Sequence, residues 1–250
     1  MTSREATQYL PREIILDGDR VHRHTPSDLA WVLAFGAIQW PWLLRSLSGG
    51  PRAAKAALLH RLQLPPDALP NLGSWKADTG LLGLIVDYIE DQQPRTVVEF
   101  GAGASTLVTA RALQLHGGGT LFSFDQHDDF VAATRAWLQE HDVQAELHAA
   151  PLTRSPAGWP GLWYDHGELP AVIDMLIIDG PPWTVHPLTR GSAESLFERI
   201  PPGGVVILDD AARPGERLVA RQWRRRWPEF DFQLVHVGTK GTLIGRRRSA

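Results

Sequence analysis

The spacing of hydrophobic residues changes near residue 95. Before this point, apolar residues recur every three or four positions, which is typical of amphipathic helices. After it, short apolar runs alternate with longer stretches of helical spacing. Strands that alternate with helices predict a parallel sheet covered on both faces. We therefore expect an α/β fold, with a doubly wound, mostly parallel sheet over residues 94–250 and an N-terminal helical extension over residues 1–93.

Seven strands are expected in this sheet, and the last two form an antiparallel hairpin around the turn "GTKG". The strand sequences are "TVVEF", "TLFSFD", "VQAELHAA", "VIDMLIID", "GGVVILDD", "FDFQLVHVG" and "GTLIGRR". Before the sheet we predict helices over 27–47, 49–64 and 81–92, the first capped by Ser27. The segment "LTRGSAESLFERI" is predicted to be an α-helix between two strands.

One connection is unusually long and is rich in Pro, Gly and Trp, over residues 151–171. Long loops at the ligand-binding edge of a sheet often act as lids or specificity walls. Trp163 and Tyr164 are therefore candidates for substrate contact. The alternative is that the tryptophans fix the loop to the core.

Composition excludes several classes of function. The formal net charge is −3, so a strongly basic surface for nucleic acid is not expected. Because there is no cysteine, disulfides, thiol catalysis and thiolate metal sites are excluded. The apolar run at 29–44 contains Gln39 and Pro41 and is shorter than the ~18–20 residues of a membrane span. With no signal pattern at the N-terminus, we expect a cytoplasmic protein without a membrane partner.

A glycine turn follows the first strand of the predicted sheet, in the sequence "VVEFGAGASTL". Gly101 and Gly103 permit a tight turn and a close approach of a ligand to the backbone. A dinucleotide fingerprint would have a third small residue where Thr106 stands, and the Glu99 carboxylate would repel a diphosphate but suit a cation. Asp125 ends the next strand, near the ~20-residue spacing at which an acid binds ribose. These features predict a ligand with a ribose and a positive charge, although a turn without a ligand and an N-cap role for Asp125 stay open.

Three carboxylates end two neighbouring strands of the predicted sheet. Asp179 ends "VIDMLIID", and Asp209 and Asp210 end "GGVVILDD". Adjacent parallel strands lie ~4.8 Å apart, so these carboxylates can converge on one ion. Oxygen ligands suit Mg²⁺, Ca²⁺ or Mn²⁺ rather than zinc. The alternative is that Asp209 and Asp210 cap the next helix and bind no metal.

The segments "VVEFGAGAS", "FSFDQ", "DMLIIDGPP" and "PPGGVVILDD" together resemble the motifs of the class I S-adenosylmethionine-dependent methyltransferases, in the same order. The resemblance covers roughly residues 94–250 and implies a Rossmann-like sheet with S-adenosyl-L-methionine as cofactor. It implies that the ammonium of the methionine part lies near Glu99 and that the ribose lies on Asp125. Because "HAAPL" replaces the family's third-strand acid, Gln126, His127 and Ala150 are candidates for the adenine contact. The implied cofactor-binding residues are Glu99, Gly101, Ala102, Gly103, Ser105, Thr106, Asp125, Gln126, His127, Ala150 and Asp179.

The acids after the fourth and fifth strands resemble those of the metal-dependent O-methyltransferases of the catechol and caffeoyl-CoA type. The resemblance implies Mg²⁺ or Mn²⁺ held by Asp179, Asp209 and Asp210. It also makes His186 or an aspartate, Asp179 or Asp210, the candidate catalytic base. Trp183 is a candidate for substrate contact because it lies close to Asp179 in the sequence. In similar enzymes the N-terminal helices close over the pocket, which adds Trp75.

The leading interpretation is an S-adenosylmethionine-dependent methyltransferase that methylates an oxygen of a small hydroxylated acceptor, such as a sugar or a phenolic natural product. The alternatives are an aminopropyl-type transferase, a non-catalytic interaction module on the same fold and, more distantly, a nicotinamide dehydrogenase. Arg190 and Arg213 are candidates for contact with an anionic acceptor or for salt bridges. A homodimer through residues 27–64 is a further candidate.

Overall fold

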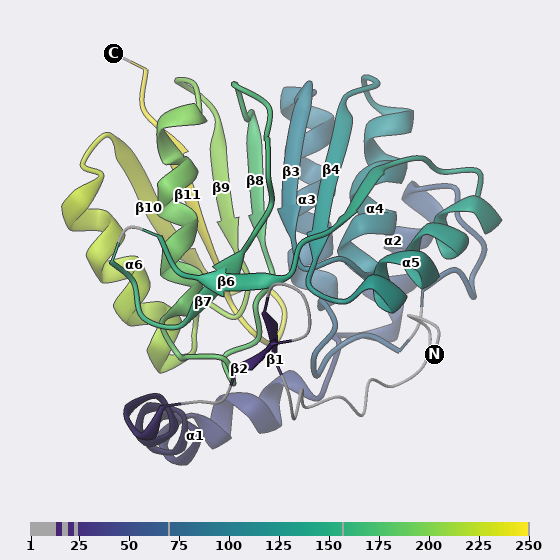
Figure 1. Ribbon diagram of the computed structural model, residues 1–250. Coiled ribbons are helices and arrows are strands. Elements are labelled where there is room, and N and C mark those ends of the chain that lie inside the picture. Colours follow the sequence, from purple (N-terminus) through teal and green to yellow (C-terminus); the bar gives the residue numbers. More distant parts are fainter. Residues whose placement is uncertain (1–13, 17–19, 23–24, 70, 157, 250) are drawn as a thin grey trace.

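A seven-stranded sheet with helices on both faces forms the centre of the molecule (Figure 1). The computed structural model describes residues 14–16, 20–22, 25–69, 71–156 and 158–249. The strand order across the sheet is β10-β11-β9-β8-β3-β4-β5. These strands span Thr96–Phe100 (β3), Thr120–Asp125 (β4), Glu146–Ala149 (β5), Met175–Ile178 (β8), Val205–Leu208 (β9), Phe230–Val235 (β10) and Thr242–Arg247 (β11).

Five neighbouring strands, from β5 to β9, run parallel, whereas β11 is antiparallel to both β9 and β10. The predicted fold class is therefore confirmed, including the antiparallel C-terminal hairpin. The chain runs outward from β3 to β5 and then returns to β8 on the other side of β3. In open α/β sheets, ligands bind at the carboxyl ends of the strands where the order reverses in this way.

The central strands are buried on both faces, because successive side chains point to opposite sides of the sheet. Val97 and Met175 lie in the core on one face, whereas their neighbours Val98 and Leu176 lie in the core on the other. One face is covered by α2 (Arg52–Arg61), α3 (Thr79–Gln92), α4 (Ala104–Leu115) and α5 (Asp128–Glu140). The other is covered by the 3₁₀ helix η1 (Thr189–Arg199) and by α6 (Pro214–Arg226). Double coverage explains why these strands are continuous apolar runs.

Helices α2 and α3 precede residue 94 in the sequence but share a core with the sheet. Leu62, just after α2, and Leu81 of α3 are fully buried in the same cluster as Val97 of β3. The division of the chain at residues 93 and 94 stays a prediction.

The segment predicted to be an α-helix over 188–200 is instead the 3₁₀ helix η1. Gly191 lies within it, and glycine weakens α-helix formation. Its backbone is packed so closely against the ring of Trp159 that a Cβ would collide with that ring. The carbonyl of Gly191 also accepts a hydrogen bond from the indole nitrogen of Trp223 at 3.1 Å. Tertiary contacts of this kind are not readable from the helical spacing.

The connection over 151–171 is not an open loop. It contains an antiparallel strand pair, β6 (Leu152–Arg154) and β7 (Leu162–Tyr164). Trp163 is 1% exposed and Tyr164 is 3% exposed, and both lie in the core beneath the sheet edge. The burial of Trp163 agrees with the alternative that the tryptophans fix the segment to the core, whereas a lid role for the segment stays a prediction. Strands of three residues are too short to show a periodic pattern.

The first long helix, α1 (Pro26–Ser46), begins at a capping box. The Thr25 hydroxyl accepts a hydrogen bond from the Asp28 amide at 3.1 Å, and the Asp28 carboxylate accepts one from the Thr25 amide at 3.1 Å. The prediction of Ser27 as the cap is wrong, because Pro26 already occupies the first helical position.

Helix α1 carries several apolar side chains that are at least half exposed: Leu29, Leu33, Ile38, Trp40 and Leu44. No helix in the described part of the chain is long and apolar enough to cross a membrane. Near α1 in Figure 1 lies a small antiparallel pair, β1 (Ile14–Leu16) and β2 (Arg20–His22). A dimer through residues 27–64 stays a prediction.

Candidate active site

The carboxyl ends of four parallel strands bring the predicted site residues to one edge of the sheet. The glycine turn follows β3, Asp125 ends β4, Asp179 follows β8, and Asp209 and Asp210 follow β9. All four strands run in the same direction, so their ends meet beside the reversal point between β3 and β8.

Gly101 allows the turn after β3 to lie directly against the turn after β8. Its φ is +100°, a region that favours glycine. A Cβ at this position would lie 2.8 Å from the amide nitrogen of Gly180 and 3.0 Å from the carbonyl carbon of Asp179. The amides of Asp179 and Gly180 both donate to the carbonyl of Phe100 at 2.8 Å. The two turns are therefore held together by backbone contacts that leave no room for a side chain.

Glu99 lies beneath the glycine turn and is fully buried. Its Oε2 accepts hydrogen bonds from the hydroxyls of Thr106 and Ser123, each at 2.6 Å. The Thr106 hydroxyl in turn accepts the amide hydrogen of Gly103 at 2.8 Å. Burial raises the pKa of Glu99, although the hydroxyls of Ser105, Ser123 and Thr106 oppose this shift. Thr106 thus connects the carboxylate to the turn, and contact between Glu99 and a cofactor stays a prediction.

The Asp125 carboxylate joins the ends of β3 and β4. Its Oδ2 accepts the amide hydrogen of Ala102 at 3.2 Å, and its Oδ1 accepts that of His127 at 3.0 Å. Burial raises the pKa of Asp125 to about 7, although the hydrogen bonds from the His127 and Ala102 amides lower it. The Ala150 amide donates to the Asp125 carbonyl at 2.8 Å, and Gln126 Nε2 lies 3.0 Å from His127 Nε2. The three candidates for adenine contact therefore lie together beside Asp125, while the N-cap of α5 is His127 rather than Asp125.

A small cavity of about 50 Å³ lies between the glycine turn and the segment before α3. Trp75 and Lys76 line one side of it, and Ala102, Phe130 and Asp179 are among the other lining residues. Burial lowers the pKa of Lys76. The position of Trp75 agrees with a covering N-terminal segment, whereas its contact with a substrate stays a prediction. Nothing in the sequence around Lys76 predicts its position at this cavity.

Asp179, Asp209 and Asp210 form an acidic cluster at the ends of β8 and β9. One carboxylate oxygen of each lies within 4.8 Å of the others. The side chains of Asp209 and Asp210 are almost completely buried, and Asp179 is partly exposed toward the cavity. The strand order thus brings these three carboxylates together, whereas a metal ion at this place stays a prediction.

Lys240 is the first of three buried cations at the acidic cluster. Its Nζ lies 3.1 Å from Asp209 Oδ2 and 3.6 Å from Asp210 Oδ1. Burial raises the pKa of Asp209, and Lys240 opposes this shift. Burial alone would lower the pKa of Lys240, but the carboxylates of Asp209 and Asp210 outweigh it and raise the pKa. The motif "GTKG" predicts only a turn lysine, because the residues that surround Lys240 in space are far away in the sequence.

Arg190 and Arg213 are the other two cations at the acidic cluster. Arg190 Nη1 lies 3.2 Å from Asp210 Oδ2, and its Nη2 lies 3.8 Å from Asp179 Oδ1. Arg213 also pairs with Asp210. Burial alone would raise the pKa of Asp210, but Arg213, Lys240 and Arg190 hold it well below its usual range. Burial raises the pKa of Asp179 well above its usual range. Of the two roles predicted for the arginines, the salt-bridged one is present.

His186 and Trp183 lie after β8 and face helix α1. The Nδ1 of His186 accepts the amide hydrogen of Leu188 at 3.1 Å, and its ring lies 5.8 Å from that of Trp31. The Trp183 indole packs so close to Gly36 that a Cβ there would lie 3.4 Å from the ring. The catalytic and substrate roles of these two residues stay predictions.

Trp163 and Tyr164 support the site from beneath. Their rings lie 5.0 and 5.2 Å from the ring of Phe100, the last residue of β3. The Tyr164 hydroxyl lies where a Cβ on Gly180 would be, so this tyrosine fixes the turn after β8. Burial raises the pKa of Tyr164 well above its usual range. Direct contact of either ring with a substrate stays a prediction.

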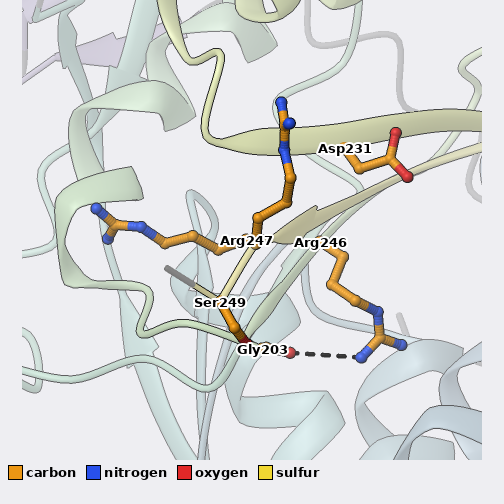
Figure 2. Close-up of a pocket in the computed structure, with 6 residues that line it drawn as sticks. Gly203, Asp231, Arg246, Arg247 and Ser249 are labelled. Atoms are coloured by element: carbon orange, nitrogen blue, oxygen red, sulfur yellow. Dashed lines mark hydrogen bonds between the residues drawn. The ribbon is translucent and has the colours of Figure 1, made fainter.

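Two larger cavities lie at the opposite edge of the sheet. One, of about 520 Å³, lies between Gly203, which precedes β9, and Arg246, near the end of β11 (Figure 2). The Arg246 side chain donates to the Gly203 carbonyl at 3.5 Å. The other, of about 780 Å³, shares Arg247, Arg248 and Ser249 with it. Because β11 is antiparallel to β9, this edge is the one away from the glycine turn, and we place the active site at the smaller cavity.

Residues 98–211 match a protein family described as a methyltransferase domain. This range contains the glycine turn, Asp125 and all three acids of the cluster. Residues 98–211 are therefore similar to a methyltransferase domain, and the strand order of the sheet is that of the class I fold of S-adenosylmethionine-dependent methyltransferases. No curated protein sequence matches the chain.

Solved methyltransferase structures share this fold at low sequence identity. One is the O-methyltransferase TomG from Streptomyces achromogenes, which is involved in tomaymycin synthesis and was solved in complex with S-adenosylmethionine. It is 16% identical to this chain with a TM-score of 0.52, and the match covers 90% of this chain and 100% of TomG. An O-methyltransferase from Bacillus cereus, in complex with S-adenosylhomocysteine, is 13% identical with a TM-score of 0.53, over 87% and 100%. The Podospora anserina methyltransferase PaMTH1, bound to S-adenosylhomocysteine, is 12% identical with a TM-score of 0.52, over 92% and 99%. At these identities the likeness establishes the fold alone.

We expect Gly101→Ala to lower the free energy of unfolding by about 1–3 kcal/mol more than Gly118→Ala, because only the first variant forces a side chain into packed backbone. Gly118 is a matched control, since its φ is also positive, at +73°, and nothing lies within 4 Å of an added Cβ. Urea denaturation of both variants measures the difference. Equal losses would mean that the turns after β3 and β8 are not in tight contact.

We expect Asp125→Asn to change how stability depends on pH. The pKa of Asp125 is about 7 in the folded chain, above that of an unfolded carboxyl. Its contribution to the free energy of unfolding is therefore fully present below about pH 4 and is lost as the pH rises through 7. Relative to the Asn variant, wild type should lose up to about 4 kcal/mol of unfolding free energy over this window. Urea denaturation from pH 4 to 8 tests this, with the exposed Asp91→Asn as control. Parallel pH profiles for wild type and Asp125→Asn would contradict the raised pKa.

Proposed function

We propose that the chain transfers a methyl group from S-adenosyl-L-methionine to a hydroxyl oxygen of a small acceptor, such as a sugar or a phenolic natural product. The observation that carries the proposal is the glycine turn with the Asp125 carboxylate beside it, inside a matched methyltransferase domain. The structural neighbours TomG and the Bacillus cereus protein, both O-methyltransferases, support oxygen as the methylated atom.

The residues at the end of β3 and β4 fit the cofactor. The backbone of residues 101–103 would hold its methionine part, and Asp125 would accept from its ribose hydroxyls. Gln126, His127 and Ala150 lie where the adenine would follow. Lys76 lines the same cavity, and its ammonium would pair with the cofactor's carboxylate because the two groups carry opposite charges. Glu99 would then position the turn, because its carboxylate accepts a hydrogen bond from the Thr106 hydroxyl, which in turn accepts the amide hydrogen of Gly103.

Cofactor binding requires the segment before α3 to move. The cavity of about 50 Å³ is much smaller than the ~300–1,000 Å³ of typical ligand pockets. Its outer wall includes Trp75 and Lys76, which belong to a turn closed by hydrogen bonds between Gly73 and Ala77 and between Lys76 and Gly73. We propose that this turn swings outward to admit the cofactor and closes again to exclude water.

When bound, S-adenosylmethionine supplies an electrophilic methyl group, so that the acceptor oxygen bonds to the methyl carbon while the carbon–sulfur bond breaks and its electron pair stays on sulfur. The chain therefore needs no nucleophile of its own. Its residues must hold the acceptor oxygen in line with the breaking bond and take up the hydroxyl proton.

Asp179 is the base that we favour for this proton. It lines the cavity beside the glycine turn, whereas Asp210 is buried and paired with Arg190 and Arg213. The Nδ1 of His186 accepts the amide hydrogen of Leu188, so a neutral ring carries its proton on Nε2 and acts there as a donor. His186 is also buried and does not line the cavity, so we favour Asp179 over it as the base.

The acidic cluster does not fit a divalent metal ion in the arrangement that the structure describes. Its oxygen donors are of the right type, and Asp209 Oδ1 and Asp210 Oδ1 are buried without a hydrogen-bond partner. However, the Lys240 ammonium lies within 3.1 Å of one of these aspartates and 3.6 Å of the other. An ion that bridged them would collide with it, so no step is assigned to a metal.

S-adenosylhomocysteine should stabilise the chain, because a ligand that binds only the folded state raises its stability. At about 100 times the dissociation constant the gain is ~2.7 kcal/mol, or roughly 5–10 °C in Tm for a chain of this size. Differential scanning calorimetry measures the shift, with NAD as the control nucleotide. A shift with NAD and none with S-adenosylhomocysteine at millimolar concentration would overturn the proposed function.

Lys76→Met should weaken the binding of S-adenosylhomocysteine about tenfold, because it removes a charged partner of the ligand's carboxylate. Lys55→Met is the matched control, since Lys55 lies on α2 and donates to the Leu69 carbonyl, away from the cavity. Isothermal titration calorimetry compares the two variants. Equal affinities would exclude Lys76 from the cofactor site.

A further inference from the structure

We propose that the Lys240 ammonium takes the place of a divalent metal ion at the acidic cluster, so that the chain is a metal-independent methyltransferase that carries its own cation. The role of Lys240 in methyl transfer rests on the proposed function above. The preference of the acidic cluster for lysine over a metal ion does not depend on that function.

The position of the ammonium is the first support. Lys240 Nζ contacts the carboxylates of both Asp209 and Asp210 and is as deeply buried as they are. A divalent ion binds carboxylate oxygens at ~2.0–2.6 Å and would need the same volume between these two side chains. Lysine and metal are therefore mutually exclusive occupants.

The backbone of Lys240 is held from both sides, which is the second support. The carboxylate of Asp78, the N-cap of α3, accepts the amide hydrogens of Thr239 and Lys240. On the other side, the Lys240 carbonyl accepts the amide hydrogen of Ala212 at 3.2 Å. Lys240 is thus built into the site by residues from two separate segments, unlike a surface lysine that has turned inward.

Close packing fixes the same hairpin turn between β10 and β11. A Cβ on Gly238 would lie 2.4 Å from the Asp78 carboxylate, and a Cβ on Gly80 would lie 2.5 Å from the Gly238 amide nitrogen. The Thr239 hydroxyl donates to the Ser48 carbonyl at 2.7 Å. The turn cannot move away from α3 without breaking these contacts, so the lysine cannot easily yield its place to an ion.

Charge balance is the third support. The carboxylates that form ion pairs with the three buried cations Lys240, Arg190 and Arg213 are those of Asp179, Asp209, Asp210 and Glu216. If all are ionised, this group carries one net negative charge. Adding a divalent ion would make it positive, whereas removing the lysine would leave two negative charges and free the oxygens of two aspartates. The arrangement predicts that metal binding appears only when the lysine is removed.

The first experiment uses wild type and needs no variant. Electron paramagnetic resonance of Mn²⁺ should detect no stoichiometric binding up to millimolar Mn²⁺. S-adenosylhomocysteine affinity and methyl transfer should be unchanged after EDTA treatment. Stoichiometric Mn²⁺ binding at micromolar concentration, or loss of activity in EDTA with recovery on adding Mn²⁺ or Mg²⁺, would overturn the proposal.

The second experiment removes the lysine. Lys240→Met should bind Mn²⁺ at least about tenfold more tightly than wild type, because loss of the ammonium leaves two net negative charges that attract the ion. Mn²⁺ should also raise the Tm of this variant. Lys55→Met is the matched control and should behave as wild type. An Lys240→Met variant that folds but gains no Mn²⁺ affinity would contradict the proposal.

A third variant covers the case in which Lys240→Met does not fold. Lys240→Met with Asp209→Asn restores the net charge and removes one metal ligand, so it should fold and bind no Mn²⁺. Tight Mn²⁺ binding by this double variant would overturn the charge argument. If S-adenosylhomocysteine fails to bind wild type, the proposed function fails, but the Mn²⁺ measurements still decide whether the cluster prefers its lysine.

Discussion

Negative charge that is carried into a buried sheet edge must be balanced, and this constraint shapes the whole candidate site. Parallel strands deliver Asp179, Asp209 and Asp210 to one place, where the free energy cost of three unpaired carboxylates would be several kcal/mol each. Buried cations, rather than solvent, neutralise these carboxylates. Lys240 comes from the β10–β11 hairpin, and Arg190 and Arg213 come from the segments after β8 and β9. Each cation ties a different part of the chain to the same edge.

The balance of charge also links the N-terminal helices to the sheet. Asp78 caps α3 and at the same time holds the hairpin turn that positions Lys240. The segment just before it carries Trp75 and Lys76 to the cavity beside the glycine turn. The movement of this segment that we propose for cofactor binding is thus limited at Asp78 by the hydrogen bonds of a buried carboxylate. The wall of the candidate cofactor site and the support of the acidic cluster therefore lie within a few residues of each other.

The glycine turn rests on a buried carboxylate, that of Glu99. Glu99 is fully buried and is linked to the turn through the Thr106 hydroxyl, which accepts the Gly103 amide hydrogen. Thr106 stands where a dinucleotide fingerprint has a small residue, and its hydroxyl accepts the hydrogen bond from the Gly103 amide that holds the turn. Asp125, with its pKa raised by burial, holds the turn from the other side. The electrostatic preference for a cationic nucleoside that the sequence predicts would therefore be exerted from beneath the loop.

Much of this protein follows from the sequence alone, because the physics involved is local. Short apolar runs and helical spacing predict the alternating strands and helices, and the rule that parallel strands end at one edge predicts that Asp125, Asp179, Asp209 and Asp210 gather there. The short strands β6 and β7 and the 3₁₀ form of η1 do not follow, since their conformations depend on packing against distant rings such as Trp159 and Phe100. Lys240 is the clearest case. Its sequence neighbours describe only a turn, and its meaning arises from Asp78, Asp209 and Asp210, which are far from it in the chain and meet it only in the folded structure.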